Sequence, residues 1–150
     1  MTRTLHSMRQ GAAIGMLLIG VAAIDVRADK VTIDATVILA SNNDGQTDSR
    51  LSAIAPKLKK IFGFRSYKHF GGGSATIGQS GRGTVKLGGG GRLAIKAEPA
   101  KTGKIRLGLQ WDRGGATVIK TTVVKRRGET IILGGAPHGG GKLIIHIVLH

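Results

Sequence analysis

Runs of glycine constrain this chain more than any other feature of its sequence. The 150 residues include 25 glycines, and beyond position 70 these gather in short clusters. The clusters are Gly71-Gly72-Gly73, Gly81-Arg82-Gly83, Gly88 to Gly91, Gly114-Gly115, Gly134-Gly135 and Gly139-Gly140-Gly141. Glycine reaches positive φ without a steric penalty, so such clusters between segments rich in Val, Ile, Leu and Thr mark hairpin turns and bulges. The pattern predicts a meander of antiparallel strands.

Alternation of apolar and polar residues supports strands between these turns. It is clearest in residues 104–111 and recurs in residues 92–98, which predicts one face in the core and one in water. The last segment, residues 142–150, is apolar on both sides in its middle and is expected to be a central strand. Further strands are expected at residues 30–40, 64–70, 116–125 and 129–133.

The period changes after the first strand. The apolar residues Leu51, Ile54, Leu58, Ile61 and Phe62 recur at helical spacing. Asp48 or Ser49 can cap the start, and Gly63 suits the position just past the end. Pro56 lies inside this stretch, so we expect a kink or a second helix that begins there. The sequence predicts a helix over about residues 48–62.

Together these elements predict an α+β domain dominated by antiparallel sheet. Its seven to eight strands, with one helix after the first, suit a sandwich or an open barrel, and the sequence does not choose between them.

The amino terminus has the layout of a secretory signal peptide. Arg3, His6 and Arg9 precede thirteen residues without a charge, Gly11 to Ala23. This apolar run is shorter than the roughly 20 residues that a membrane-spanning helix requires, which disfavours the alternative of a retained anchor. We expect cleavage after Ala28. The domains are then a signal peptide, residues 1–28, and one exported domain, residues 29–150, in the periplasm, in the cell envelope or secreted.

The exported domain carries a large positive charge. The whole chain has 23 Lys and Arg against 8 Asp and Glu, and without residues 1–28 the counts are 20 and 7, a net charge of +13. Such a field attracts polyanions. Outside the cytoplasm these are lipid head groups, acidic polysaccharides and acidic proteins. Nucleic acid is disfavoured by export and by the scarcity of aromatic side chains for base stacking.

Basic residues concentrate in two places. One group, Lys57, Lys59, Lys60, Arg65 and Lys68, lies in and after the predicted helix. The other group alternates on the polar face of adjacent strands and is the predicted anion-binding site: Arg92, Lys96, Lys104 and Arg106. The alternative is that this charge only keeps the domain soluble.

The sequence predicts no catalytic, cofactor-binding or metal-binding residues. The seven carboxylates of residues 29–150 form no pair that the pattern brings together. His146 and His150 share a strand face about 13 Å apart, too far for one metal ion. With 0 cysteines the chain has no disulfide and no thiolate ligand. Gly88 to Gly91 lacks the Lys-Ser/Thr pair and the helix of a phosphate-binding loop.

Lys125 to Gly135, followed by the apolar final strand, resembles the closing segment of bacterial secretins. That segment has a turn with Gly and an acidic or amide residue before a Val/Ile run that ends in Gly-Gly. The resemblance covers about 25 residues, 125–149, and the chain is too short for the periplasmic domains and pore of these ring-forming outer-membrane channels. It implies a role in the cell envelope and contact with a larger assembly, without a pore function. The rest of the chain resembles a small exported bacterial protein.

These features predict a noncatalytic, exported, basic β domain that binds or scaffolds an anionic envelope component or a protein assembly. Peripheral contact with a membrane is compatible with this charge. Two alternatives stay open: a subunit of a secretion or adhesion complex, and a hydrolase that acts on an acidic envelope polymer.

Overall fold

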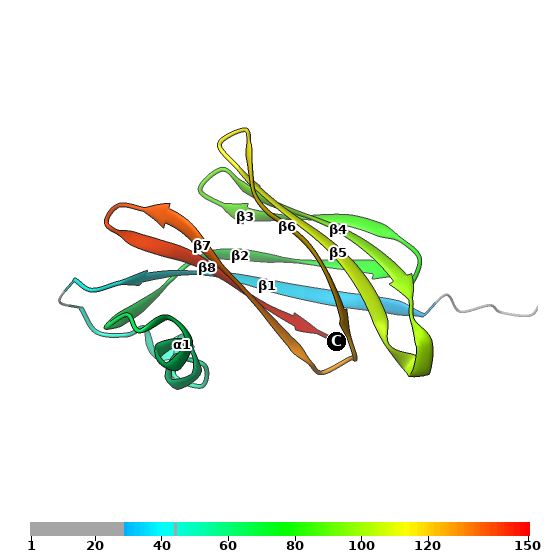
Figure 1. The fold of residues 1–150 in the computed structure, drawn as a ribbon, viewed down its shortest axis with the longest axis horizontal. Helices are drawn as coiled ribbons and strands as arrows, with labels where there is room; N and C mark the ends of the chain where they lie inside the picture. Colours follow the sequence, from blue (N-terminus) through cyan, green and yellow to red (C-terminus); the bar gives the residue numbers. More distant parts are fainter. Residues whose placement is uncertain (1–28, 44) are drawn as a thin grey trace, which may run out of the picture.

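The computed structural model describes residues 29–43 and 45–150, which form two antiparallel sheets and one α-helix (Figure 1). The signal peptide predicted for residues 1–28 lies outside the described residues. The strands are β1 (Lys30–Ser41), β2 (Ser66–Gly78), β3 (Arg82–Gly88), β4 (Gly91–Pro99), β5 (Ile105–Arg113), β6 (Ala116–Lys125), β7 (Thr130–His138) and β8 (Gly141–Leu149). The helix α1 spans Ala55–Phe62, and 3₁₀ turns occupy Ser49–Leu51 (η1) and Lys101–Gly103 (η2).

Each sheet has four strands. Sheet A has the order β2-β1-β8-β7, and sheet B has the order β3-β4-β5-β6. All neighbouring strands are antiparallel. The predicted α+β fold, with eight mainly antiparallel strands and a helix after the first, is therefore confirmed as a sandwich-like arrangement. The final strand, β8, lies between β1 and β7, as its two apolar faces predict.

The main core lies between the two sheets. Alternate residues of each strand point inward, as a period of two requires. On β5, Ile105, Leu107, Leu109 and Trp111 are all buried and pack in one cluster with residues of sheet A such as Ile145. The polar residues between them on β5 consequently face outward, as the alternation predicts.

A second core lies on the opposite face of sheet A, where α1 covers one end of the sheet. Ile38 of β1 and Ile144 of β8 are fully buried there against Leu58 of the helix. Tyr67 of β2 and Leu51 of η1 complete the cluster. Sheet A is therefore apolar on both faces at this end and forms the middle layer between α1 and sheet B.

The helical region does not form one helix over residues 48–62 but is divided, with a separate helix that begins near Pro56, as the alternative prediction has it. Asp48 caps the short turn η1 by accepting a hydrogen bond from the backbone N–H of Arg50. A separate helix, α1, then begins with Pro56 in its first turn, where the missing N–H has no helical partner to lose. It ends at Gly63, which has φ of 73°. In residues 29–43 and 45–150, no helix has the length and apolar character needed to cross a bilayer.

The glycine run Gly71-Gly72-Gly73 lies within β2, directly after a bulge at Phe70 in the pairing of this strand with β1. The predicted strand at residues 64–70 thus continues to Gly78. A Cβ added at Gly71 would collide with the backbone carbonyl oxygen of Leu87 on β3. The glycines therefore let β2 and β3 approach each other closely, and this approach joins the two sheets along one side.

This close approach predicts that Gly71→Ala lowers the free energy of unfolding by about 1–3 kcal/mol, the usual cost of overpacking. Gly78→Ala is the matched control, because a Cβ at that end of the same strand meets no atom within 4 Å. Denaturant unfolding followed by circular dichroism measures both variants. Equal stabilities for the two variants would contradict the assigned role of Gly71.

A candidate anion-binding groove on sheet B

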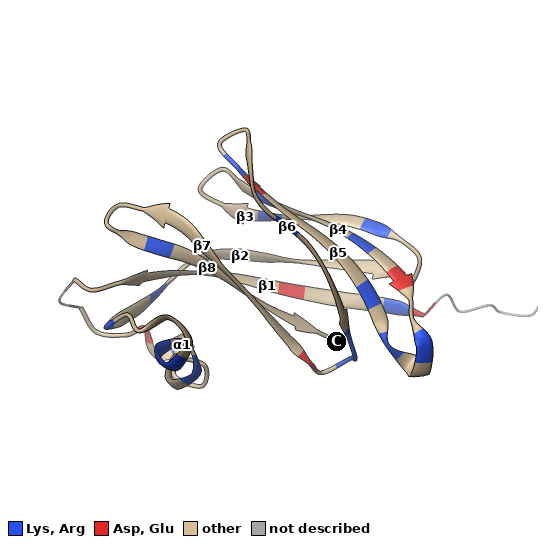
Figure 2. Ribbon diagram, in the orientation of Figure 1, with Lys and Arg blue, Asp and Glu red and all other residues tan. Residues whose placement is uncertain are grey.

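The predicted anion-binding residues lie largely on one surface. Arg92 and Lys96 of β4 and Arg106 of β5 project from the outer face of sheet B, where Figure 2 shows basic residues on several strands. Lys104 is exposed and immediately precedes β5. The sheet therefore brings three of the four residues onto one face and leaves Lys104 at its margin.

Carboxylates partly neutralise these three cations. Glu98 lies 2.8 Å from Lys96 and 3.9 Å from Arg106, measured between the charged nitrogen and oxygen atoms. Asp112 lies 3.8 Å from Arg92 by the same measure. Exposed pairs of this kind contribute little to stability, but they reduce the positive charge offered to a ligand. The predicted cluster is thus less basic than its sequence indicates.

Hydrogen bonds from neighbouring side chains keep both carboxylates ionised. The hydrogen bond from Lys96 is the main cause that lowers the pKa of Glu98 below its ordinary value. For Asp112, hydrogen bonds from Gln110 and Thr117 are the main causes that lower the pKa. Both groups therefore stay negative at neutral pH, so the ion pairs persist there.

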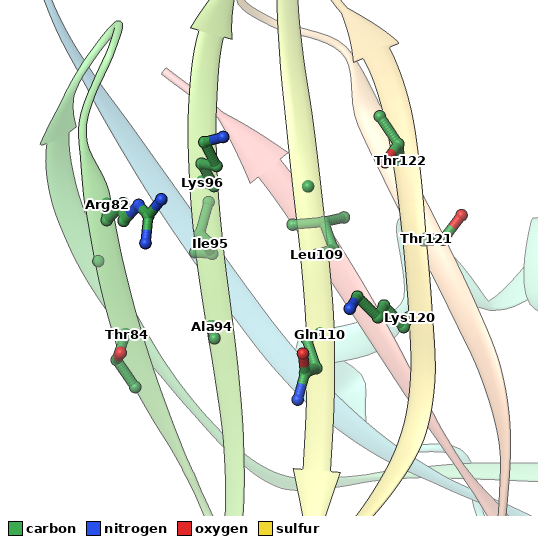
Figure 3. Close-up of a pocket in the computed structure, with 12 residues that line it drawn as sticks. Arg82, Thr84, Ala94, Ile95, Lys96, Leu109, Gln110, Lys120, Thr121 and Thr122 are labelled. Carbon is green, nitrogen blue, oxygen red and sulfur yellow. The ribbon is translucent and has the colours of Figure 1, made fainter.

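A groove crosses the outer face beside these pairs. Cross-strand register places Arg82 of β3 opposite Lys96, and Lys96 opposite Gly108 of β5. Ala94 lies in the next row, so Ala94 and Gly108 together form a floor of small residues. Lys120 of β6 extends toward β5 from the other side (Figure 3). The result is an open groove of about 850 Å³ with cations on both sides.

Two of these cations, Arg82 and Lys120, were not predicted. Arg82 lies between two glycines and was assigned to a turn, whereas it begins β3. Lys120 lies in a strand of mixed Val, Ile and Thr, and only its pairing opposite Gln110 shows which face it occupies. The alternation of Arg82, Thr84 and Lys86 on β3 was the signal that could have found the first. In the described part of the chain, neither Arg82 nor Lys120 forms an ion pair.

The lining of the groove consists of hydrogen-bond donors and small apolar groups. Arg82, Lys96 and Lys120 supply the charged donors, and Thr84 and Thr122 supply hydroxyl groups. The lining residues include neither a carboxylate nor an aromatic ring. This chemistry suits an anionic ligand held by charge-assisted hydrogen bonds.

The histidines in the described part of the chain do not converge. His146 and His150 lie on the outer face of sheet A, where the Nε2 atom of His150 is 2.9 Å from a carboxylate oxygen of Asp34. His138 of β7 instead bonds to Arg113 of β5, with 2.8 Å between Nδ1 and the guanidinium. Within residues 29–43 and 45–150, no three His, Cys, Asp or Glu side chains are grouped to hold a metal ion.

Comparison with protein-family models, curated proteins and solved structures found no match to this chain. The segment that resembles the closing part of secretins, residues 125–149, forms the turn after β6 and the antiparallel pair β7 and β8. The relation to secretins stays a prediction.

The ion pairs of Glu98 predict that Glu98→Gln strengthens retention on an anionic matrix, because it releases both Lys96 and Arg106. Asp34→Asn is the control, since it makes the same change in net charge on the outer face of sheet A. The measurement is the NaCl concentration at elution. Elution of both variants at the same salt concentration would mean that only total charge matters.

The lowered pKa of His146 predicts that the folded protein loses stability in mild acid. Burial, and secondarily the charge of Lys57, lower the pKa of His146 below its ordinary value of 6.5. His146 therefore binds a proton more readily in the unfolded chain than in the folded one. As a result, the free energy of unfolding falls as the pH drops below about 6.5 toward the folded-state pKa. His146→Gln should lose less stability between pH 7 and pH 5, and His69→Gln, at an exposed site, should behave like the parent. Urea unfolding at each pH measures this difference.

Proposed function

We propose that residues 29–150 form an exported, noncatalytic domain that binds an anionic component of the cell envelope in the groove on sheet B. The observation that carries this proposal is the small-residue floor of Ala94 and Gly108 between Arg82, Lys96 and Lys120. This groove shares only Lys96 with the residues predicted from the sequence. It adds Arg82 and Lys120, and its lining does not include Arg92, Lys104 or Arg106.

Packing does not explain the glycine in this floor. Glycine inside a strand weakens the strand, and it is often retained where another backbone or a ligand approaches closely. At Gly108 the nearest atoms to an added Cβ are 3.8 Å away, which is ordinary contact, and its φ is not positive. A Cβ would therefore fit at this position, and it would take up space on the floor of the groove. We infer that residue 108 is small to leave room for a ligand.

The groove favours an extended acidic polymer over a compact ion. It crosses four strands, and three inter-strand spacings cover roughly 14 Å. Lys96 and Lys120 come from strands two spacings apart, about 10 Å, so they reach successive anionic groups of a chain better than a single one. The absence of aromatic rings from the lining gives no platform for stacking bases. These features support an acidic polysaccharide as the ligand class.

The alternative of a hydrolase acting on an acidic polymer has less support. Hydrolysis of a glycosidic bond ordinarily uses two carboxyl groups that flank the bond. The nearest acids on this face, Glu98 and Asp112, are engaged with Lys96 and with Gln110 and Thr117. The groove therefore supports binding without catalysis.

Filling the groove tests the proposal. Gly108→Val should weaken retention on immobilised alginate at least fivefold, because the branched side chain occupies the floor, while thermal stability is retained or rises. Neutralising the three cations together, with Arg82→Gln, Lys96→Gln and Lys120→Gln, should abolish retention at physiological salt. Affinity chromatography and circular dichroism measure the two properties.

A control variant has the same net charge as the triple variant in the groove. Lys57→Gln, Lys59→Gln and Lys60→Gln remove three charges from α1, across sheet A from the groove, and should leave most of the retention on alginate. Equal losses for the two triple variants, or full retention by Gly108→Val, would overturn the groove as the binding site.

One observation favours the second candidate, a subunit of a secretion or adhesion complex. β6 is the last strand of sheet B, and none of its ten residues is buried. It contains no proline, whereas β7, one of the two edge strands of sheet A, has Pro137 and a bulge at Gly135. A long, β-branched edge offers free backbone groups to another strand.

This candidate predicts a mass in solution above that of one chain. Thr121→Lys places a charge on the inner side of β6, a device by which edge strands resist pairing, and should return the protein to one chain. Light scattering coupled to size exclusion measures the mass. If the unmodified protein has the mass of a single chain at all concentrations, self-association through β6 is ruled out.

A further inference from the structure

A second basic surface lies on the exposed face of α1. Lys57, Lys59 and Lys60 are all exposed there. In the described part of the chain, no carboxylate oxygen lies within 4.0 Å of their amino groups. No described ion pair therefore offsets the charge of these lysines, in contrast to Arg92, Lys96 and Arg106 on sheet B.

An exposed apolar side chain accompanies these lysines. Ile61 has 54% of its side chain exposed, and it is one of two large exposed hydrophobic residues in the described structure. Lys57 and Ile61 are four residues apart, and Lys60 precedes Ile61, so a helical period places the three on neighbouring parts of one surface. Leu58 is fully buried against sheet A, so Lys57 and Ile61 flank the buried side of the helix on one side and Lys59 flanks it on the other.

This surface and the groove face opposite directions. α1 packs on one face of sheet A, and sheet B packs on the other. The exposed side of α1 therefore points away from sheet B, and Figure 2 shows basic residues on both the helix and the far sheet. A partner bound at α1 leaves the groove open.

We propose that the α1 surface, defined by Lys57, Lys59, Lys60 and Ile61, docks on an anionic phospholipid surface. The lysines complement the negative head groups. Ile61 selects a lipid surface over a soluble polyanion, because only the lipid offers an apolar region in which to bury that side chain.

The expected interaction is reversible and sensitive to salt. Each lysine near an anionic bilayer contributes a several-fold gain in affinity, so three give about a hundredfold. Partial insertion of one isoleucine adds a further gain of several-fold. Binding of this strength is peripheral, and it holds the domain with its groove directed away from the lipid.

This inference does not depend on the groove. If both hold, the domain connects an acidic polymer to the lipid surface. If only one of the two proposals holds, the two assays show which one. Binding to alginate reports on the groove of sheet B, and binding to vesicles reports on α1.

Tryptophan scanning of residues 29–150 tests which face docks. Ile61→Trp places a fluorophore on α1, and Thr122→Trp places one beside the groove, against a background from Trp111, which is 1% exposed. Vesicles of phosphatidylcholine with 30% phosphatidylglycerol, about a third anionic lipid, should shift the emission of Ile61→Trp to the blue and leave that of Thr122→Trp unchanged. Vesicles of phosphatidylcholine alone should shift neither.

Sedimentation with the same vesicles separates charge from insertion. Ile61→Ser should weaken binding about threefold or more at constant charge. The triple variant Lys57→Gln, Lys59→Gln and Lys60→Gln should weaken binding at least tenfold, and the matched triple variant Arg82→Gln, Lys96→Gln and Lys120→Gln should retain most of it. The proposal is overturned by a blue shift at residue 122 in place of residue 61, by equal losses in both triple variants, or by absence of binding to anionic vesicles.

Discussion

Burial of both faces of sheet A is the constraint on which the rest of this structure depends. At one end, Val37 and Ile145 point into the core between the sheets, while Ile38 and Ile144 point into the core under α1. With 0 cysteines, the chain has no disulfide, so these two cores must hold the layers together. Because sheet A is the middle layer, the surfaces left for partners, on sheet B and on α1, lie on opposite sides of the domain.

Glycine has three separate roles in this arrangement. At Gly63 and in hairpins such as Gly114-Gly115 it supplies positive φ. At Gly71 it removes a side chain that would collide with β3 and so joins the sheets along one side. At Gly108 neither reason applies, and the missing side chain leaves space on the outer face of sheet B. Only the third role bears on a ligand, and it supports the proposed groove.

Charge is distributed unequally between the two basic surfaces. The cluster predicted from the sequence includes Arg92, Lys96 and Arg106, and each of these lies near Glu98 or Asp112. Glu98 lies two positions after Lys96 on the same strand, and the other two pairs join neighbouring strands. The loss of positive charge therefore depends on the geometry of the sheet. The lysines of α1 have no such neighbours among the described residues. Of the three cations in the proposed polymer contact, Lys96 is ion-paired, whereas none of the three lysines in the proposed lipid contact is paired with a described carboxylate.

The sequence by itself determined the fold class, the alternation that buries Trp111 and Leu107, the central place of β8 and the cap at Gly63, because these follow from local periods and from the conformational range of glycine. The prediction of a turn at Gly71 was wrong, because this glycine run continues strand β2. The reason for glycine there is the backbone of Leu87 on β3, which is distant in the sequence. Of the cations in the proposed groove, the sequence pattern predicted Lys96 and missed Arg82 and Lys120. Only the tertiary structure decided which side chains meet across Ala94 and Gly108. These side chains come from different strands, and the strand register and the bulges decide which residues become neighbours.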